Sequence, residues 1–242
     1  FGHACILIET QDVTILTDPI VSYSFSSEID RFSFKDLPDK IDYVLLTHNH
    51  QDHVVFETLI QLRHKIRTIV LPNNQKGSLV DPSLKLILQK LGFTSIITLD
   101  DMESIPIPGG EIIGLPFLGE HGDLNIQTKL AHYINLNGKS FVCAADTNNI
   151  DPDLYNHVFD HLGLIDFLFL GMECDGAPLS WVYGPMFTTP LLRAYDYGRN
   201  LSGSNCEKAW PLIEKSGCKY AYIYAMGQEP WLTYMMALKY TD

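Results

Sequence analysis

The chain has 242 residues, of which 46% are hydrophobic, and it carries a formal net charge of −12 at pH 7. This length suits one large α/β domain, and no Pro/Gly/Ser-rich linker divides it. The acidic balance argues against a nucleic-acid-binding surface, which needs clustered Lys and Arg, and no apolar stretch approaches a membrane span. We therefore expect one catalytic-sized domain over residues 1–242, with neither nucleic acid nor membrane as a partner.

The cysteines are odd in number and widely spaced, which favours mostly buried free thiols in a reducing, cytoplasmic compartment. The chain also lacks an initiator Met and a signal peptide, and its first residues lead directly into an apolar segment. We expect it to be a portion of a longer protein. The five cysteines are Cys5, Cys143, Cys174, Cys206 and Cys218.

Hydrophobic patterning in the first half of the chain predicts alternating strands and helices. Residues 4–9 and 13–17 form a predicted hairpin, and Asp18-Pro19 ends its second strand. The apolar run 41–46 predicts a buried strand that leads into a helix at 54–64. The same alternation predicts, in order, a strand at 68–71, a helix at 83–91 and a strand at 95–99.

The second half continues the pattern, with its strongest turn signal at Asn137-Gly138. Two aromatic segments, 21–39 and 176–203, could wall a substrate pocket or could be plain core packing, and the sequence leaves both possibilities open. The predicted elements are a strand at 111–118, a hairpin of 129–136 with 140–145, a helix at 153–162, a strand at 165–171, a helix at 205–216 and a strand at 220–225.

Four potential metal ligands follow the strand 41–46 in the pattern H-x-H-x-D-H. They are His48, His50, Asp52 and His53. Imidazoles two residues apart in an extended segment project to the same side, while Asp52 and His53 come round in the turn. One loop can thus offer two sets of ligands, which suits a pair of metals, and neutral imidazole is the commonest metal ligand. The cluster lies where α/β folds place their sites, at the carboxyl end of a strand.

This motif resembles the signature of the metallo-β-lactamase superfamily. The resemblance implies an α/β (α+β) fold, an αββα sandwich with a dinuclear metal site at one edge. It assigns His48 and His50 to metal one, and Asp52 and His53 to metal two. The opening Gly2-His3-Ala4 adds to the likeness, but the family pattern gives His3 no ligand role. We therefore expect His3 to support the site or the fold rather than to bind metal.

Two further positions complete the ligand set that the resemblance implies. Asp146, at the end of the apolar run 141–145, matches the family's bridging carboxylate. The third ligand of metal one is normally His, but the matching stretch offers both Glu120 and His121, and alternation lets only one point at the metal. Glu120 would make an oxygen-rich set that suits iron or manganese, whereas His121 would favour zinc. If it is not a ligand, His121 is a candidate proton source beside Glu120 and Asp146.

A Glu at this place resembles the di-iron oxygenases built on the same fold, the β-hydroxylases that act on nonribosomal peptide intermediates, as in chloramphenicol biosynthesis. The resemblance implies two irons, O2 as co-substrate and an external electron donor. It also implies a substrate that is an aminoacyl thioester tethered to a carrier protein and hydroxylated at the β-carbon. In that family a separate domain precedes the catalytic domain, and it could carry a homodimer contact.

One departure concerns metal two, which the family closes with a His near the C-terminus. The last His here is His161, so either a C-terminal end is missing, which we favour, or Glu173, Asp175 or water substitutes.

The alternative function is a zinc- or manganese-dependent hydrolase, a lactonase or phosphodiesterase, which predicts that His121 binds and that O2 is not needed. A third reading is a non-catalytic interaction module. His64, His132 and His157 are expected at the surface or in structural roles.

Overall fold

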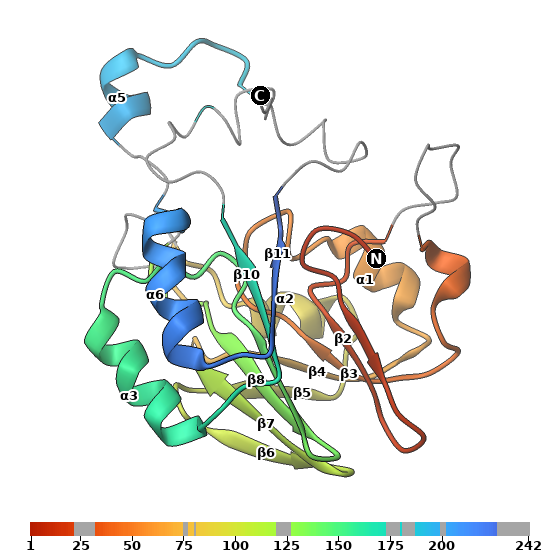
Figure 1. The fold of residues 1–242 in the computed structure, drawn as a ribbon. Helices are drawn as coiled ribbons and strands as arrows, with labels where there is room; N and C mark the ends of the chain where they lie inside the picture. The colour runs from red at the N-terminus through yellow and green to blue at the C-terminus, as the bar shows by residue number, and fades with distance from the viewer. Residues whose placement is uncertain are drawn as a thin grey trace.

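A computed structural model describes residues 1–21, 32–74, 77–79, 81–119, 127–172, 180, 187–198 and 202–226. The described residues form two facing β-sheets with helices on both outer sides, the αββα sandwich that the sequence predicts (Figure 1). The first sheet contains, in order, β1 (Leu7–Glu9), β2 (Thr14–Thr17), β3 (Ile41–Leu45), β4 (Ile66–Pro72) and β5 (Ile96–Leu99).

The second sheet is mixed. Strands β9, β10 and β11 run parallel, whereas β6 to β9 pair antiparallel in sequence order. The predicted strands are all present, but β6 is an addition that the sequence analysis missed, because Pro106 weakens a strand signal and is tolerated at a sheet edge. The order is β11 (Tyr220–Tyr224), β10 (Phe167–Gly171), β9 (Lys139–Cys143), β8 (Ala131–Leu136), β7 (Gly110–Leu115) and β6 (Ser104–Ile107).

Three helices begin at a residue whose side chain accepts a hydrogen bond from one of the first backbone N–H groups. Ser83 accepts from the Leu86 amide, Asp151 from the Leu154 amide and Asn205 from the Lys208 amide. The predicted helices are confirmed, each with ends shifted by no more than a few residues. They are α1 (Phe56–Leu62), α2 (Leu84–Lys90), α3 (Pro152–Leu162) and α6 (Cys206–Ser216), and a 3-10 turn η1 (Phe34–Asp36) and α5 (Arg193–Gly198) add to them.

Strand alternation divides the core into three layers. In β3, Leu45 points between the two sheets, while its neighbour Val44 packs toward α1 and α2. In β9, Cys143 points between the sheets and Val142 packs toward α3 and α6, which cover that outer face (Figure 1). Both faces of each sheet are therefore buried over the central strands, and this fixes how the strand ends line up at the edge that carries the candidate ligands.

The cysteines follow the prediction only in part. Cys5 and Cys143 are buried free thiols, and burial raises the pKa of Cys5 to about 12. Cys206, the first residue of α6, is exposed, and Cys218 is half-buried. Cys174 lies outside the described residues. None of the helices described here is long and apolar enough to cross a membrane.

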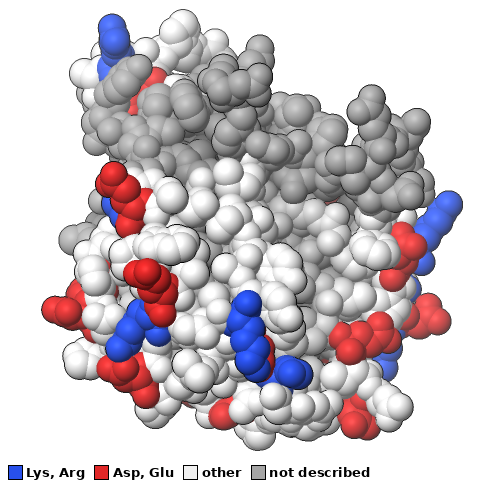
Figure 2. Space-filling view, in the orientation of Figure 1, with Lys and Arg blue, Asp and Glu red and all other residues white. Residues whose placement is uncertain are grey.

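Strand β11 is an edge strand whose side chains are largely exposed. Tyr220 and Tyr222 are 56% and 47% exposed, and their rings stack on Phe167 and Phe169 of β10 with centroids 5.4 and 5.1 Å apart. On the face that contains β11, the described charged side chains gather at the left and right and in the lower middle, with uncharged surface between them (Figure 2). Stacking across β10 and β11 therefore holds the last strand in register.

A buried histidine links the two sheets beside the candidate site. His132 of β8 is buried, and its Nε2–H donates to the carbonyl of Leu46 at the end of β3 (3.0 Å). The expected structural role of His132 is thus confirmed, while His64 and His157 are exposed, as predicted. Burial lowers the pKa of His132 below its ordinary value, so the ring is neutral in the folded protein at neutral pH.

Replacing His132 by Phe leaves the Leu46 carbonyl without this donor, and we expect a loss of about 1–3 kcal/mol in unfolding free energy near pH 7.5. The folded pKa is depressed, so the unfolded chain binds more protons as pH falls below about 6.5, and native stability is lost in that range. The variant has no histidine to protonate at this position, so it does not lose stability in this way as pH falls. The difference in unfolding free energy between wild type and variant therefore becomes smaller near pH 5.5. Urea unfolding of both proteins measures this, with the exposed His157→Gln as control; an equal deficit at both pH values would contradict it.

Candidate metal centre

The loop after β3 brings two imidazoles together with the carboxylate that follows β9. Ligand atoms of His48, His50 and Asp146 lie within 4.8 Å of one another, and all three residues are buried. The His48 and His50 rings meet edge to face, with centroids 4.7 Å apart, as expected for residues two apart in an extended segment. The backbone of Lys129 bridges to His48, so the start of the second sheet holds this loop in place.

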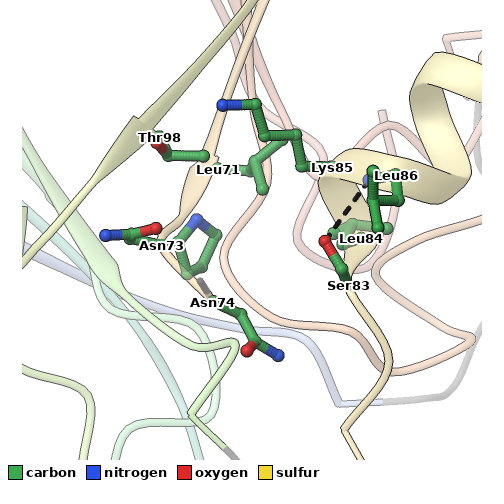
Figure 3. A pocket seen from close by; sticks show the side chains of 9 residues that line it. Leu71, Asn73, Asn74, Ser83, Leu84, Lys85, Leu86 and Thr98 are labelled. Atoms are coloured by element: carbon green, nitrogen blue, oxygen red, sulfur yellow. Dashed lines mark hydrogen bonds between the residues drawn. The ribbon is translucent and has the colours of Figure 1, made fainter. Parts of the chain in front are cut away.

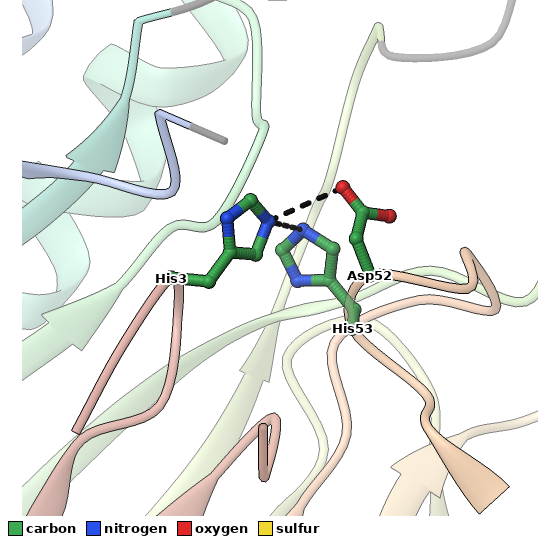
Figure 4. A group of neighbouring side chains, drawn as sticks. All are labelled: His3, Asp52 and His53. Atoms are coloured by element: carbon green, nitrogen blue, oxygen red, sulfur yellow. Dashed lines mark hydrogen bonds and ion pairs between the residues drawn. The ribbon is translucent and has the colours of Figure 1, made fainter. Parts of the chain in front are cut away.

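A second buried group contains His3, Asp52 and His53, whose ligand atoms also lie within 4.8 Å of one another. Figure 4 shows His3 approaching from the N-terminal segment and meeting two residues of the loop after β3. The Nε2 atom of His3 lies 3.2 Å from Asp52 Oδ2 and 3.2 Å from His53 Nε2. The loop thus presents ligands to two separate groups.

Asp146 lies between the two groups. Its Oδ2 atom is 3.6 Å from His48 Nε2 and 3.2 Å from His53 Nε2. One carboxylate oxygen therefore faces an imidazole of each group. This is the position that a carboxylate bridging two metals would need.

His3 lies beside the candidate ligands, as its expected supporting role requires, and its ring is in direct contact with Asp52 and His53. Its ligand atom is also close enough to join their group, so the expectation that His3 does not bind metal stays a prediction. The predicted hairpin of residues 4–9 and 13–17 could have placed His3 at the site, because β1 and β2 pair antiparallel. Since the carboxyl end of β2 lies at the site, the residues before β1 must lie at the same edge.

Asp18 and Thr47 orient one imidazole of each group. Asp18 Oδ2 accepts hydrogen bonds from His53 Nδ1 (2.8 Å) and from the Thr47 hydroxyl (2.5 Å), and its Oδ1 accepts from the Thr47 amide (2.7 Å). Because the Thr47 hydroxyl uses its one hydrogen in the bond to Asp18, its oxygen accepts a hydrogen bond from His48 Nδ1 at 3.0 Å. Both rings thus carry a proton on Nδ1, which leaves the Nε2 atoms of His48 and His53 to bind a cation.

The arrangement requires positive charge between its donor atoms. With Nδ1–H bound to Asp18, the Nε2 lone pair of a neutral His53 faces the oxygen of Asp146 at 3.2 Å, and these two would repel. Burial disfavours charged His53, but the carboxylates of Asp146, Asp18 and Asp52 outweigh it and raise the pKa of His53 well above its ordinary value.

Asp52 shows the complementary effect. Burial alone would raise its pKa, but the hydrogen bond from His3 and the neighbouring imidazoles lower it far below the ordinary range. Asp52 is thus ionised at physiological pH. Imidazoles and carboxylates form a donor set that fits first-row transition metals, so the residues present fit a pair of such ions.

Backbone strain concentrates at this edge. Four of the six described non-glycine residues with positive φ are His3 (50°), Asp18 (31°), Ala145 (46°) and Ala225 (54°). Side chains with a Cβ disfavour this region, so surrounding contacts must impose it. The unfavourable backbone conformations therefore lie next to the candidate ligands, where contacts that fix the side chains outweigh the local cost.

Two adjoining cavities open beside the carboxyl ends of β4 and β5. The smaller, of about 290 Å³, lies between Asn73 and Thr98 on one side and Ser83 and Leu86 on the other (Figure 3). The larger, of about 510 Å³, shares Asn73 with it and is also lined by Phe117. The Phe117 ring meets the ring of His48 edge to face, with centroids 5.0 Å apart, so the larger cavity lies next to the first metal-ligand group.

Several predicted site residues lie outside the described part of the chain. They are Glu120 and His121, the two rival ligands of metal one, and Glu173 and Asp175, the possible substitutes on metal two. The assignment of metal one to Glu120 or His121 therefore stays a prediction. The same holds for most of the aromatic residues in segments 21–39 and 176–203.

An αββα sandwich with paired His/Asp groups at its strand ends defines the chain as a metallo-β-lactamase-fold protein. Residues 1–132 match the family described as Beta-lactamase superfamily domain. The chain belongs to this family.

Two comparisons extend over the whole chain. It is 44% identical over 243 residues to the 4-amino-L-phenylalanyl-[CmlP-peptidyl-carrier-protein] 3-hydroxylase of Streptomyces venezuelae, covering 100% of this chain and 46% of that protein. It superposes with a TM-score of 0.89 on the crystal structure of CmlA, a diiron β-hydroxylase from Streptomyces venezuelae, at 44% identity over 99% of this chain and 46% of that one. The chain thus spans less than half the length of these relatives.

A more distant structure shares the fold. Igni18, a metallo hydrolase from the archaeon Ignicoccus hospitalis, superposes with a TM-score of 0.61 at 18% identity, over 93% of this chain and 80% of that one. At this identity the likeness concerns the fold alone.

The Asp18–Thr47 contacts predict how metal binding responds to their loss. Asp18→Asn replaces a carboxylate oxygen by an NH2 group, which cannot accept the hydrogen bonds that Thr47 and His53 donate to Asp18. The His53 ring then loses its fixed orientation, so we expect metal affinity to fall about 10–100-fold. Thr47→Val removes the acceptor of His48 Nδ1 and should act in the same direction, whereas Thr47→Ser keeps the hydroxyl and serves as the matched control. Competition with a metal chelator measures the affinities. Equal affinities in Thr47→Val and Thr47→Ser would refute the role of the hydroxyl.

Proposed function

We propose that this chain is the catalytic domain of a di-iron monooxygenase that hydroxylates a C–H bond, at the β-carbon, of an aminoacyl group tethered to a carrier domain of a nonribosomal peptide synthetase. The observation that carries the proposal is the full-length match of this chain, at 44% identity, to a carrier-protein-dependent 3-hydroxylase. The two buried His/Asp groups supply the kind of ligands that such a reaction needs.

In this proposal His48, His50 and Glu120 hold one iron, Asp52 and His53 hold the other, and Asp146 lies between them. His3 is placed beside the second group, where the sequence leaves the last ligand open. When bound, the irons supply O2 activation and the oxidation of the C–H bond. An external donor must supply two electrons, because one oxygen atom of O2 enters the substrate and the other leaves as water.

The residues of the chain contribute orientation and exclusion of water. His48, His53, Asp52 and Asp146 are all buried, so bulk water has little access to the donor atoms. Asp18 and Thr47 hold the Nδ1 protons of His53 and His48, which keeps the opposite nitrogen of each ring turned inward. These contacts are in place before any substrate binds, so the geometry of the site needs no reorganisation during the reaction.

We propose that the substrate reaches the site from the side of the larger cavity. Phe117 stands between that cavity and His48, and its ring supplies an apolar wall near the first group. An aminoacyl group on a carrier needs an opening of this kind, since the carrier protein itself stays outside. The chain spans 46% of the Streptomyces venezuelae 3-hydroxylase, and our proposal includes a separate domain before the catalytic one, where a homodimer contact would lie.

Metal content tests the proposal first. We expect about two irons per chain and little zinc in protein expressed with both metals in excess, by element-resolved mass spectrometry. With reductant and O2, a carrier-bound aminoacyl substrate should gain 16 Da, and no product should form without O2. About two zincs per chain, with lactone or phosphodiester hydrolysis in the absence of O2, would instead establish the hydrolase alternative.

Glu120 and His121 give a direct comparison within one dipeptide. If Glu120 is the ligand of metal one, Glu120→Ala lowers the bound iron toward one per chain, while His121→Ala keeps about two. The reason is that removing a charged ligand costs far more affinity than removing a neighbouring proton donor. Iron content and Mössbauer spectra of both variants measure this, and loss of iron in His121→Ala alone would reverse the assignment.

A further inference from the structure

The turn that carries Asp146 is held by two neighbouring strands. Strand β9 ends at Cys143, and Ala145 then adopts a left-handed conformation with φ of 46°. Its N–H donates to the hydroxyl oxygen of Tyr224 (3.0 Å), and its carbonyl accepts from the amide of Gly171 (2.8 Å). A residue with a Cβ does not prefer this conformation by itself, so these two hydrogen bonds help to impose it.

The two residues that hold the Ala145 peptide are direct partners in the sheet. Gly171 ends β10 and pairs with Tyr224, which ends β11. A Cβ added at Gly171 would lie 2.9 Å from the Ala145 carbonyl oxygen and 3.0 Å from Asp146 Oδ1. The end of β10 therefore has room for the Asp146 carboxylate only because it carries no side chain.

Tyr224 is suited to a fixed hydrogen-bonding role. Its ring packs at a tilt against Phe169 of β10, with centroids 5.8 Å apart. Burial of the hydroxyl, together with Cys143 and Asp18, raises the pKa of Tyr224 well above its ordinary value, so the phenol stays neutral. The next residue, Ala225, donates its N–H to the carbonyl of His3 (3.3 Å). The end of β11 thus contacts the backbone behind both metal-ligand groups.

We propose that Tyr224 is a positioning residue for the metal centre. It fixes the left-handed turn at Ala145 and thereby sets the Asp146 carboxylate between the two groups of ligands. The edge strand β11 is in this way coupled to the metals through one hydroxyl. The inference rests on the dinuclear site of the proposed function, but it does not depend on which metal binds or which reaction follows.

The test is Tyr224→Phe in the full-length protein, which removes one oxygen and keeps the ring. We expect metal affinity, measured by chelator competition, to fall about 10–100-fold, as for other residues that orient metal ligands. The Mössbauer spectrum of the iron-loaded variant should also change, because the carboxylate between the irons moves. Tyr222→Phe, two residues earlier on the exposed part of β11, is the matched control and should leave both readouts unchanged.

A wild-type affinity and spectrum in Tyr224→Phe would overturn the proposal, as would equal changes in Tyr222→Phe. If Tyr224→Phe does not fold, Gly171→Ala places a methyl group against the same turn and should produce the same loss of affinity and the same spectral change; unchanged readouts there would also overturn it. Protein that binds two zincs would contradict the di-iron function, yet the affinity comparison with zinc would still decide the role of Tyr224.

Discussion

The rest of the structure depends on one electrostatic constraint, the convergence of buried lone pairs at the edge of the sandwich. Asp146 faces an imidazole nitrogen of each ligand group, and Asp52 faces His3. The carboxylates and the imidazole lone pairs repel one another unless a proton or a metal cation lies between them, and burial removes the water that would otherwise screen them. The site therefore favours cations, and the protein around it must hold the donor atoms in place.

The fold meets this requirement by bringing ligands from separate elements to one edge and fixing each by backbone contacts. Residues after β2, β3 and β9 and residues before β1 all reach this edge. Asp18 couples the first sheet to both ligand groups through Thr47 and His53, while Tyr224 and Gly171 hold the turn of Asp146 from the second sheet. The left-handed residues at this edge show that local conformational preference yields to these contacts.

Local patterns were a reliable guide wherever the determining forces act within a short segment. Alternation and turn chemistry predicted the hairpin at Asn137-Gly138, and hydrophobic patterning predicted α3 and α6 within one residue of their observed starts. They failed at β6, because a proline is compatible with a strand only at a sheet edge, and a local reading cannot tell edge from centre.

The sequence by itself placed His48, His50, Asp52 and His53 together in one loop, because spacing along a strand and the turn after it decides which side chains share a side. The resemblance of this motif to the metallo-β-lactamase family added the sandwich fold and the place of Asp146. Only the tertiary structure decided that His3 joins Asp52 and His53, that Asp18 and Thr47 orient the imidazoles, and that Tyr224 supports the turn of Asp146. Tyr224 lies 79 residues from Ala145 along the chain. Contacts between residues so far apart depend on the pairing and packing of both sheets, and no periodicity within a single segment encodes them.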